Sequence, residues 1–386
     1  MEIVVLAGNG ISIPGNPLLE MHALTDSLKK KFKEAAGEDG DAAQALASLS
    51  RTLTGDSASE TANFEHLLGP LDSAAKGFAD IGPLLRIARK GVDHTELERS
   101  MKTTSEFLRD LYRRGSAITL EQVVSAKGNE HTEKFIQEML AIANGRKVDN
   151  IYLGTLNYDS LLHAALLGDH RDELCDLADG QRRSKEYEVI PGERPISGKP
   201  LRTRNNLPRG KRIAVLQMHG SAAWLRNPSG NPDVIRFPLR SLRNRNYWEA
   251  LRDGRTEWLP EVVLTSQSGK LERIKERPFE LAYSIFKATA HMSKSILIIG
   301  YGFRDRAVNE ALQAVVSAED PGQEKDILVV TKGADPTTEE IKGVLMPAPR
   351  EGGYVISHQE PIICRCGIPD TFGCDKWVSW VERIRE

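Results

Sequence analysis

Uninterrupted apolar runs and helix-period patterns alternate along much of this chain. Residues 3–7 (Ile-Val-Val-Leu-Ala) are apolar without alternation, which is typical of a strand buried on both faces of a parallel sheet. Similar runs recur later, and most are followed by helical spacing. This alternation predicts an α/β fold with a doubly wound parallel sheet. The expected strands are 3–7, 150–155, 213–218, 262–265, 295–299 and 327–331, the expected helices after them are 160–167, 279–291, 307–316 and 337–344, and short runs at 354–357 and 377–384 close the chain.

Between the first two strands, residues 17–148 carry almost only helical patterns. In the first of these patterns, apolar residues recur at helical spacing from Leu18 to Phe32. Because this block separates two strands of one sheet, it is predicted to be a helical insertion (17–148), with residues 1–16 and 149–386 forming the main domain. Segments rich in Pro, Gly and Arg near 168–210 and 226–260 are expected to be loop insertions. Further helices of the insertion are expected at 42–53, 63–75, 95–112 and 132–143.

Composition places the chain among globular proteins and excludes several classes. Its 386 residues are 40% hydrophobic and 27% charged, with a net charge of −2, which gives no overall signal for nucleic acid or a membrane. The amino terminus enters a strand without a basic region, so no signal peptide is expected. Four cysteines are too few for a disulfide framework in a chain of this length, which favours a cytoplasmic location.

Small and polar residues follow several of the predicted strands directly. In open α/β sheets, ligands bind at the carboxyl ends of the strands. A glycine turn between a strand and a helix can present backbone N–H groups to a phosphate, although an ordinary tight turn would look the same. The segments at the strand ends are Gly8-Asn9-Gly10-Ile11-Ser12, Thr155-Leu156-Asn157-Tyr158-Asp159, Met218-His219-Gly220 and Gly300-Tyr301-Gly302-Phe303-Arg304-Asp305.

These four segments, in this order, resemble the motifs of the sirtuin family, which are G-A-G-x-S, T-Q-N-x-D, H-G and G-[ST]-S. The resemblance implies a Rossmann-like sheet that binds NAD. The form at 300–305 and the helix start Asn63-Phe64-Glu65 are similar to divergent bacterial sirtuin-like proteins of antiphage defence. The residues that match the family motifs are Gly8, Gly10, Ser12, Thr155, Asn157, Asp159, His219, Gly220 and Gly300.

The departures from the family are concentrated on the side that would hold a peptide. Protein deacetylases of the family carry a zinc ribbon with two C-x-x-C pairs, whereas no cysteine lies between Cys175 and Cys364 here. The G-I-P-D-F-R segment of those enzymes is replaced by residues 13–17 (Ile-Pro-Gly-Asn-Pro), and the F-G-E segment by residues 264–267. The expected fold is therefore of sirtuin type with a helical insertion and no zinc ribbon.

The resemblance also implies roles for individual residues. His219 would act as general base and Asn157 would bind the attacking water or the ribose. Ser12 and Asp159 would lie near the nicotinamide carboxamide. Gly8, Asn9 and Gly10 would approach the pyrophosphate, and Gly220, which follows His219, would also belong to the NAD-binding residues. Gly300, Tyr301 and Gly302 would lie near the adenosine ribose.

Less specific explanations exist for several of these residues. Asn157 is also a favoured helix N-cap, and Asp305 is expected to cap the following helix rather than to contact a ligand. The arginines at 182–212 and 236–255 are expected to form a solvated surface, with DNA or partner docking as an alternative. Cys364, Cys366, Cys374 and His358 could bind zinc, but their spacing is not that of a recognised zinc finger, so buried thiols are expected and no metal.

The leading functional hypothesis is an NAD glycohydrolase that acts as an antiphage, abortive-infection effector, with NAD as substrate and water as acceptor. Its products would be nicotinamide and ADP-ribose. Control would come from self-assembly into a homo-oligomer or from a partner, and the resemblance suggests a HerA-like hexameric ATPase, with DNA contact through that partner or the basic loops and no membrane contact. An NAD-dependent deacylase or ADP-ribosyltransferase, and a non-catalytic NAD or ADP-ribose sensor, are the alternatives.

Overall fold

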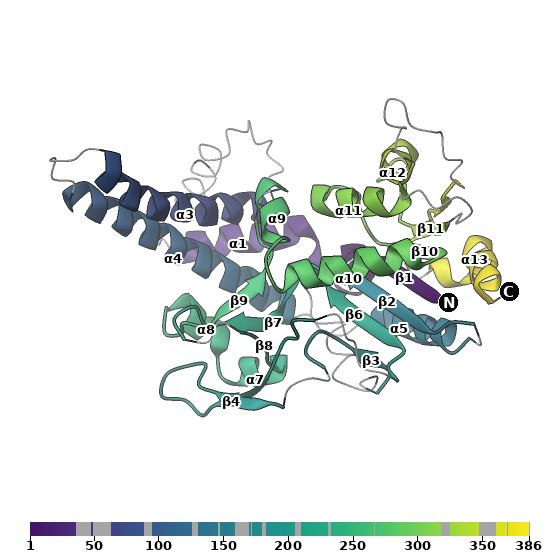
Figure 1. Cartoon of the computed structure of the whole chain (residues 1–386), viewed down its shortest axis with the longest axis horizontal. Coiled ribbons are helices and arrows are strands. Elements are labelled where there is room, and N and C mark those ends of the chain that lie inside the picture. The colour runs from purple at the N-terminus through teal and green to yellow at the C-terminus, as the bar shows by residue number, and fades with distance from the viewer. Residues whose placement is uncertain are drawn as a thin grey trace.

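The structure is a computed structural model, and it shows an elongated molecule with a parallel sheet at one end (Figure 1). The described residues are 1–35, 48, 63–88, 95–125, 130–145, 147–158, 170, 172–179, 183–204, 210–230, 233–265, 267–317, 325–346, 360–368 and 370–385.

The central element is a seven-stranded sheet in which every neighbouring pair is parallel. Its strand order is β12-β11-β10-β1-β2-β6-β3. If the short edge strand β3 is set aside, this is the doubly wound order of dinucleotide-binding folds, which confirms the predicted α/β fold with a doubly wound parallel sheet. The strands are β1 (Glu2–Ala7), β2 (Asn150–Thr155), β3 (Leu174–Cys175), β6 (Ile213–Gln217), β10 (Ser295–Ile299), β11 (Asp326–Val330) and β12 (Ile362–Cys364).

Helices cover both faces of this sheet. On one face, α5 and α13 pack in a core with β1, β2 and β10, and on the other face α10, α11 and α12 form a second core (Figure 1). The strands carry consecutive apolar residues because both of their faces are buried in this way. The covering helices are α5 (Glu130–Ala143), α10 (Phe279–Met292), α11 (Arg306–Val316), α12 (Thr338–Leu345) and α13 (Asp375–Arg385).

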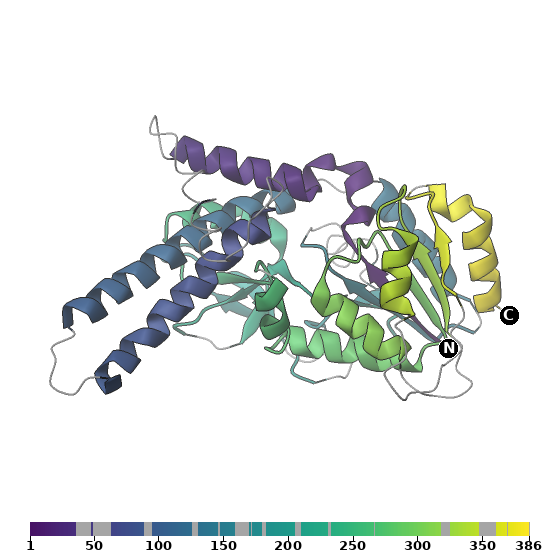
Figure 2. The ribbon, with the colours of Figure 1, turned by 90° about the horizontal axis from the view of Figure 1, so that it is seen from above.

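A second layer of structure lies beside the parallel sheet. It is an antiparallel sheet of order β4-β5-β8-β7-β9, and it shares one hydrophobic core with α1, α3, α4, α7 and α8. From above, α3 and α4 lie side by side and project away from the parallel sheet (Figure 2). The elements are α1 (Met21–Ala35), α3 (Phe64–Ala88), α4 (Thr95–Ser125), β4 (Lys185–Tyr187), β5 (Ile196–Pro200), β7 (Gly220–Arg226), β8 (Val234–Arg236), α7 (Leu239–Asn244), α8 (Tyr247–Arg252), β9 (Leu259–Val262) and α9 (Gln267–Arg273).

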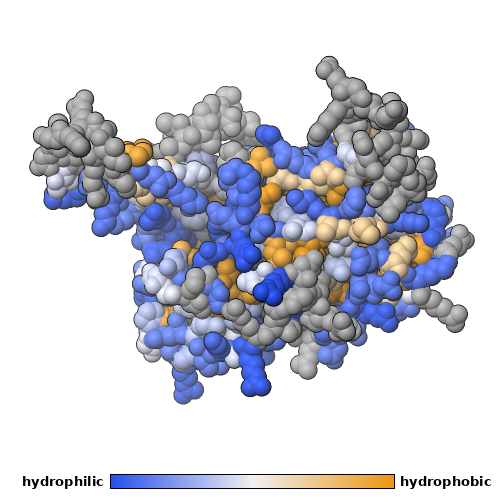
Figure 3. All heavy atoms as spheres, in the orientation of Figure 1, coloured by the Kyte–Doolittle hydropathy of each residue, from blue (hydrophilic) through white to orange (hydrophobic). Residues whose placement is uncertain are grey.

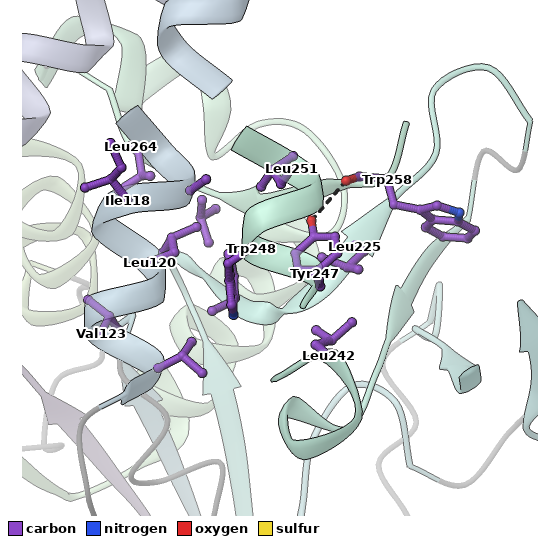
Figure 4. Packing of buried hydrophobic residues seen from close by; sticks show 14 of the residues in the cluster. Ile118, Leu120, Val123, Leu225, Leu242, Tyr247, Trp248, Leu251, Trp258 and Leu264 are labelled. Carbon is purple, nitrogen blue, oxygen red and sulfur yellow. Dashed lines mark hydrogen bonds between the residues drawn. The ribbon is translucent and has the colours of Figure 1, made fainter. Parts of the chain in front are cut away.

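The shared core joins parts of the sequence that are far apart. Side chains of α4 point toward those of α7, α8 and the adjoining strands (Figure 4). The buried Tyr247 hydroxyl donates to the carbonyl oxygen of Trp258 at 2.9 Å, which satisfies its polar group inside this core. The helices predicted as an insertion and the segments predicted as loops therefore pack against each other. By contrast, α5 lies within the predicted insertion range but packs on the parallel sheet.

Most of the long strands and helices agree with the predictions from the sequence, and the differences have physical causes. Segments 182–209 and 227–260 were expected to be irregular, yet they contain β4, β5, β8, α7 and α8. These elements have only three to six residues, too few for a periodic signal. The last strand is Ile362–Cys364, and β9 lies at Leu259–Val262 rather than at 262–265. Segments 42–53, 160–167 and 354–357 lie outside the described residues, apart from Ser48.

Helices α3 and α4 are longer than predicted because glycines inside them do not end them. A Cβ added at Gly115 would lie 2.3 Å from Leu68 Cδ2, so this glycine lets α3 and α4 approach closely. The glycine therefore serves helix packing and not helix termination.

The face shown in Figure 3 is mostly hydrophilic, with hydrophobic residues mainly near its middle. Within the described ranges, no helix combines the length and apolar character needed to cross a membrane.

Candidate active site

A cavity of about 1000 Å³ opens at the carboxyl edge of the parallel sheet. In the sheet register, Ala7 pairs with Thr155 and Ile299, and Thr155 pairs with Gln217, so β1, β2, β6 and β10 end at one level. The next residues along each strand therefore meet at the cavity. They include Gly8, Asn9, Gly10, Asn157, His219, Gly300, Tyr301 and Gly302, all of which line it. The β1–β10 crevice is where the strand order reverses, and ligands bind there in folds of this type.

The glycines at this crevice bring two strand ends together. A Cβ at Gly8 would lie 2.5 Å from the Gly300 oxygen, and one at Gly10 would lie 2.7 Å from Gly300 Cα. The Gly8 and Gly10 N–H groups donate to the carbonyl oxygens of Ile299 and Gly300. These glycines are therefore required by backbone packing, and their amides are engaged within the protein. The space around a Cβ at Gly302 is open.

Asn157 presents an unsatisfied acceptor at the cavity. Its side chain is buried, and its Nδ2 donates to Ser12 Oγ at 3.2 Å. Its Oδ1 is buried and has no hydrogen-bond partner among the described residues. Buried polar atoms are nearly always paired, so this oxygen is suited to bind a ligand or water. Ser12 is fully buried behind Asn157 and orients the amide without lining the cavity.

His219 lines the same cavity and is only 4% exposed. Its Nε2 lies 3.3 Å from the Tyr283 hydroxyl and 3.6 Å from Asp305 Oδ2, and its ring stacks on Tyr158. Burial lowers the pKa of His219 to about 4, more strongly than the Asp305 carboxylate raises it. The imidazole is therefore neutral at pH 7 and can accept a proton.

Next to His219 lies a buried charge network, defined here as Glu65, Lys270 and Asp305, and all three residues also line the cavity. Lys270 Nζ lies 2.9 Å from Glu65 Oε2 and 2.8 Å from Asp305 Oδ2, and all three side chains are buried. Burial alone would lower the pKa of Lys270, but the two carboxylates raise it above its usual value. Burial would raise the pKa of Asp305, but His219 and Lys270 lower it. Lys270 and Asp305 therefore stay ionised at neutral pH, and their ion pair holds Asp305 beside the imidazole.

The network also connects the helical segment to the sheet. Glu65 belongs to the first turn of α3, and its Oε1 accepts a hydrogen bond from the Tyr158 hydroxyl at 2.6 Å. Asp305 caps α11, as predicted, because its side chain accepts from the N–H of Val308. It also faces Lys270 and His219, so the expectation of a cap alone was too narrow.

The low pKa of His219 predicts acid-sensitive stability. The unfolded chain binds a proton at this residue below about pH 6.5, whereas the folded chain does so only near pH 4. The free energy of unfolding should therefore fall as pH drops through this window, by about 3 kcal/mol in total. Urea unfolding at pH 7 and pH 4.5 should show this loss in the wild type and a smaller loss in His219→Gln. Equal losses in the two proteins would contradict the prediction.

Other predicted site residues have different placements. Gly220 does not line the cavity; its φ of +81° and the 2.1 Å between an added Cβ and the Glu261 oxygen explain a glycine there. The buried Tyr301 hydroxyl donates to the Asp305 carbonyl oxygen or to Asn309 Oδ1. Asp159 lies outside the described residues. The sequence-based site omitted Lys270, which gives no local signal, and noted Glu65 only as part of a helix start.

Arginines of the segment predicted as a basic loop are largely paired within the protein. Arg236 is buried, and its guanidinium donates to Asp176 Oδ1 at 2.6 Å and to Asp179 Oδ1 at 3.1 Å. Arg252 pairs with Glu121, and Arg255 pairs with Asp253. The expectation that this whole segment forms a solvated basic surface is therefore wrong for Arg236.

Three cysteines that were expected to be buried thiols form a cluster. The Sγ atoms of Cys364, Cys366 and Cys374 all lie within 4.8 Å of one another. Cys364 is buried, Cys374 is partly buried and Cys366 is exposed, while His358 lies outside the described residues. The expectation of no metal is thus open to question. The cluster follows β11, not the strand at 213–217, after which the deacetylase ribbon would lie.

Comparison with known proteins adds a family assignment. The family model described as SIR2-like domain matches residues 152–345. A solved structure described as "Structural Basis for the Mechanism and Regulation of Sir2 Enzymes" is 12% identical to this chain, with a TM-score of 0.41, and the match covers 100% of this chain and 92% of that one. No curated protein matches the sequence significantly.

Proposed function

This chain belongs to the SIR2-like domain family, whose members generally consume NAD, and from that premise we propose that it is an NAD glycohydrolase. The reaction cleaves NAD to nicotinamide and ADP-ribose, with water as acceptor. One observation carries the proposal. The neutral imidazole of His219 and the side-chain oxygen of Asn157, which has no hydrogen-bond partner among the described residues, line the same cavity.

The proposed step balances with these two residues and one water. The bond from ribose C1′ to the nicotinamide nitrogen breaks, and its electron pair stays on nicotinamide. Asn157 Oδ1 orients the water that attacks C1′, and His219 accepts the proton that the water loses. Asp305, 3.6 Å away, stabilises the imidazolium that forms. A weak base suffices because positive charge develops on the sugar ahead of attack, as in glycoside hydrolysis generally.

The basic side chains that line the cavity support a pyrophosphate substrate. Lys29, Arg304 and Lys332 contribute to the lining, and so do the carboxylates of Glu20, Asp26 and Asp335, the last of which pairs with Arg304. Since the Gly8 and Gly10 amides donate within the protein, we expect the basic side chains to hold the phosphates. The Asn9 side chain stabilises the wall of the cavity, because its Nδ2 donates to the Leu19 carbonyl oxygen at 2.7 Å.

The proposal is tested by measuring nicotinamide and ADP-ribose after incubation with NAD, using chromatography. We expect Asn157→Ala to lower the rate about tenfold to a hundredfold, because the water loses its orienting acceptor. Asn144→Ala is the matched control, since Asn144 is exposed at the end of α5 and outside the cavity. Equal rates for Asn157→Ala and the control would overturn the assignment.

Two other outcomes would replace the proposal. Turnover that requires an acetylated peptide would identify a deacylase. Heat stabilisation by NAD or ADP-ribose without nicotinamide release would identify a sensor.

The biological role is proposed from the resemblance to defence proteins. Depletion of NAD would halt a phage-infected cell, so the enzyme would need a trigger. We propose control by self-assembly or by a HerA-like hexameric ATPase, and the projecting helices α3 and α4 offer a surface for it (Figure 2). In this proposal DNA contact comes through that partner, because several arginines of this chain already pair with its own carboxylates.

A further inference from the structure

The three-cysteine cluster lies where three short segments meet. Cys364 ends β12, Cys366 lies in the turn after it, and Cys374 directly precedes α13. Cys364 Sγ and Cys374 Sγ are 3.3 Å apart, and all three sulfurs lie within 4.8 Å. We infer that these thiols form a zinc site that braces one wall of the cavity.

The sulfur spacing is close to that of a zinc–thiolate centre. With Zn–S bonds of about 2.3 Å and tetrahedral angles, sulfurs lie about 3.8 Å apart. A disulfide would account for only two of the three thiols. Among the described residues the cluster offers three ligand atoms, so the proposal assigns the fourth position of the tetrahedron to a water molecule. Cys175, the fourth cysteine of the chain, lies far off on β3, where burial raises its thiol pKa to about 12.

Binding releases three thiol protons as three Zn–S bonds form, which leaves a net charge of −1 on the centre. The surroundings suit that charge. Cys374 precedes the eleven-residue helix α13, whose N-terminus favours negative charge. Lys376, in the first turn of this helix, donates from Nζ to the carbonyl oxygen of Ile363, next to Cys364.

The backbone of the cluster is continuous with the wall of the cavity. The Thr331 N–H donates to the Cys364 carbonyl oxygen, and Gly367 N–H donates to the Thr331 oxygen. The backbone of Cys366 also forms an isolated antiparallel β-bridge with that of Lys332. Thr331, Lys332, Gly367 and Ile368 all line the cavity. A metal at the cluster would therefore hold this wall in place without entering the cavity, and the inference does not depend on the proposed reaction.

The test is metal content, measured by mass spectrometry on protein purified in reductant from zinc-supplemented cells. We expect one zinc per chain in the wild type and in the control Cys175→Ala. Cys366→Ser should lose the metal with little effect on folding, because this side chain is exposed. The affinity for zinc should fall by at least the roughly 10–100-fold that follows from mutating residues that only hydrogen-bond to metal ligands. Cobalt substitution should give a thiolate-to-metal charge-transfer band that Cys366→Ser lacks.

A second measurement keeps the inference testable if a variant folds poorly. A chelator should lower the melting temperature of the wild type and Cys175→Ala and leave that of Cys366→Ser unchanged. The inference is overturned if reduced wild type holds no zinc and takes up none. It is also overturned if Cys366→Ser keeps wild-type zinc, or if peptide mapping finds a Cys364–Cys374 disulfide in place of the metal.

Discussion

His219→Ala should reduce the rate of nicotinamide release from NAD by about 10²–10⁴-fold, the usual contribution of a positioned general base. The imidazole is a neutral proton acceptor in the cavity that Asn157 also lines, and alanine removes it. The rate is measured by chromatography at saturating NAD. NAD affinity, measured separately by calorimetry, should change far less, because the proton transfer belongs to the chemical step.

His170→Ala is the matched control for this substitution. His170 pairs with Glu133 at 2.9 Å and lies outside the cavity, so its loss should leave the rate unchanged. The wild-type rate should also stay level between about pH 6 and pH 8, because a pKa of about 4 keeps the imidazole neutral there. A variant His219→Ala that still released nicotinamide at the wild-type rate would remove His219 from the mechanism.

Lys270→Met should destabilise the protein by about 3–5 kcal/mol, the usual result of removing one partner from a buried ion pair. The substitution leaves the carboxylates of Glu65 and Asp305 buried and facing each other without the ammonium between them. The free energy of unfolding is measured by urea titration at pH 7. Adding Glu65→Gln to Lys270→Met should recover part of the loss, because one unpaired charge is then gone.

Lys342→Met provides the comparison at the surface. Lys342 pairs with Glu360 at 2.9 Å, but both side chains are exposed, so the change should stay within about 0.5 kcal/mol. If Lys270→Met behaved like Lys342→Met, the network would not be the buried connection between α3 and the site. In the Lys270 variant, the fall in rate on the acid side of the pH profile should begin at a higher pH. The reason is that the Lys270 ammonium lowers the pKa of both His219 and Asp305.

The parallel sheet was predictable because its strands are buried on both faces. Runs such as 3–7 and 295–299 have no alternation, and the structure assigns strands to both. The second sheet was not predictable in this way. Strands such as Lys185–Tyr187 and Val234–Arg236 have three residues each, which is too short for a period-two pattern to identify them. Short strands acquire their stability from pairing and packing, which a local pattern does not record.

The sequence by itself determined the strand ends and the chemistry they carry. Gly8, Asn157, His219 and Gly300 each follow an apolar run, and parallel pairing in register brings such positions to one edge. Only the tertiary structure decided how these residues are used. Gly8 and Gly10 make room for Gly300, and Ser12 supports Asn157. Lys270 joins Glu65 to Asp305 next to His219. Burial and charge pairing arise between segments distant in the chain, so packing alone determines the electrostatics of His219 and the meeting of the three cysteines.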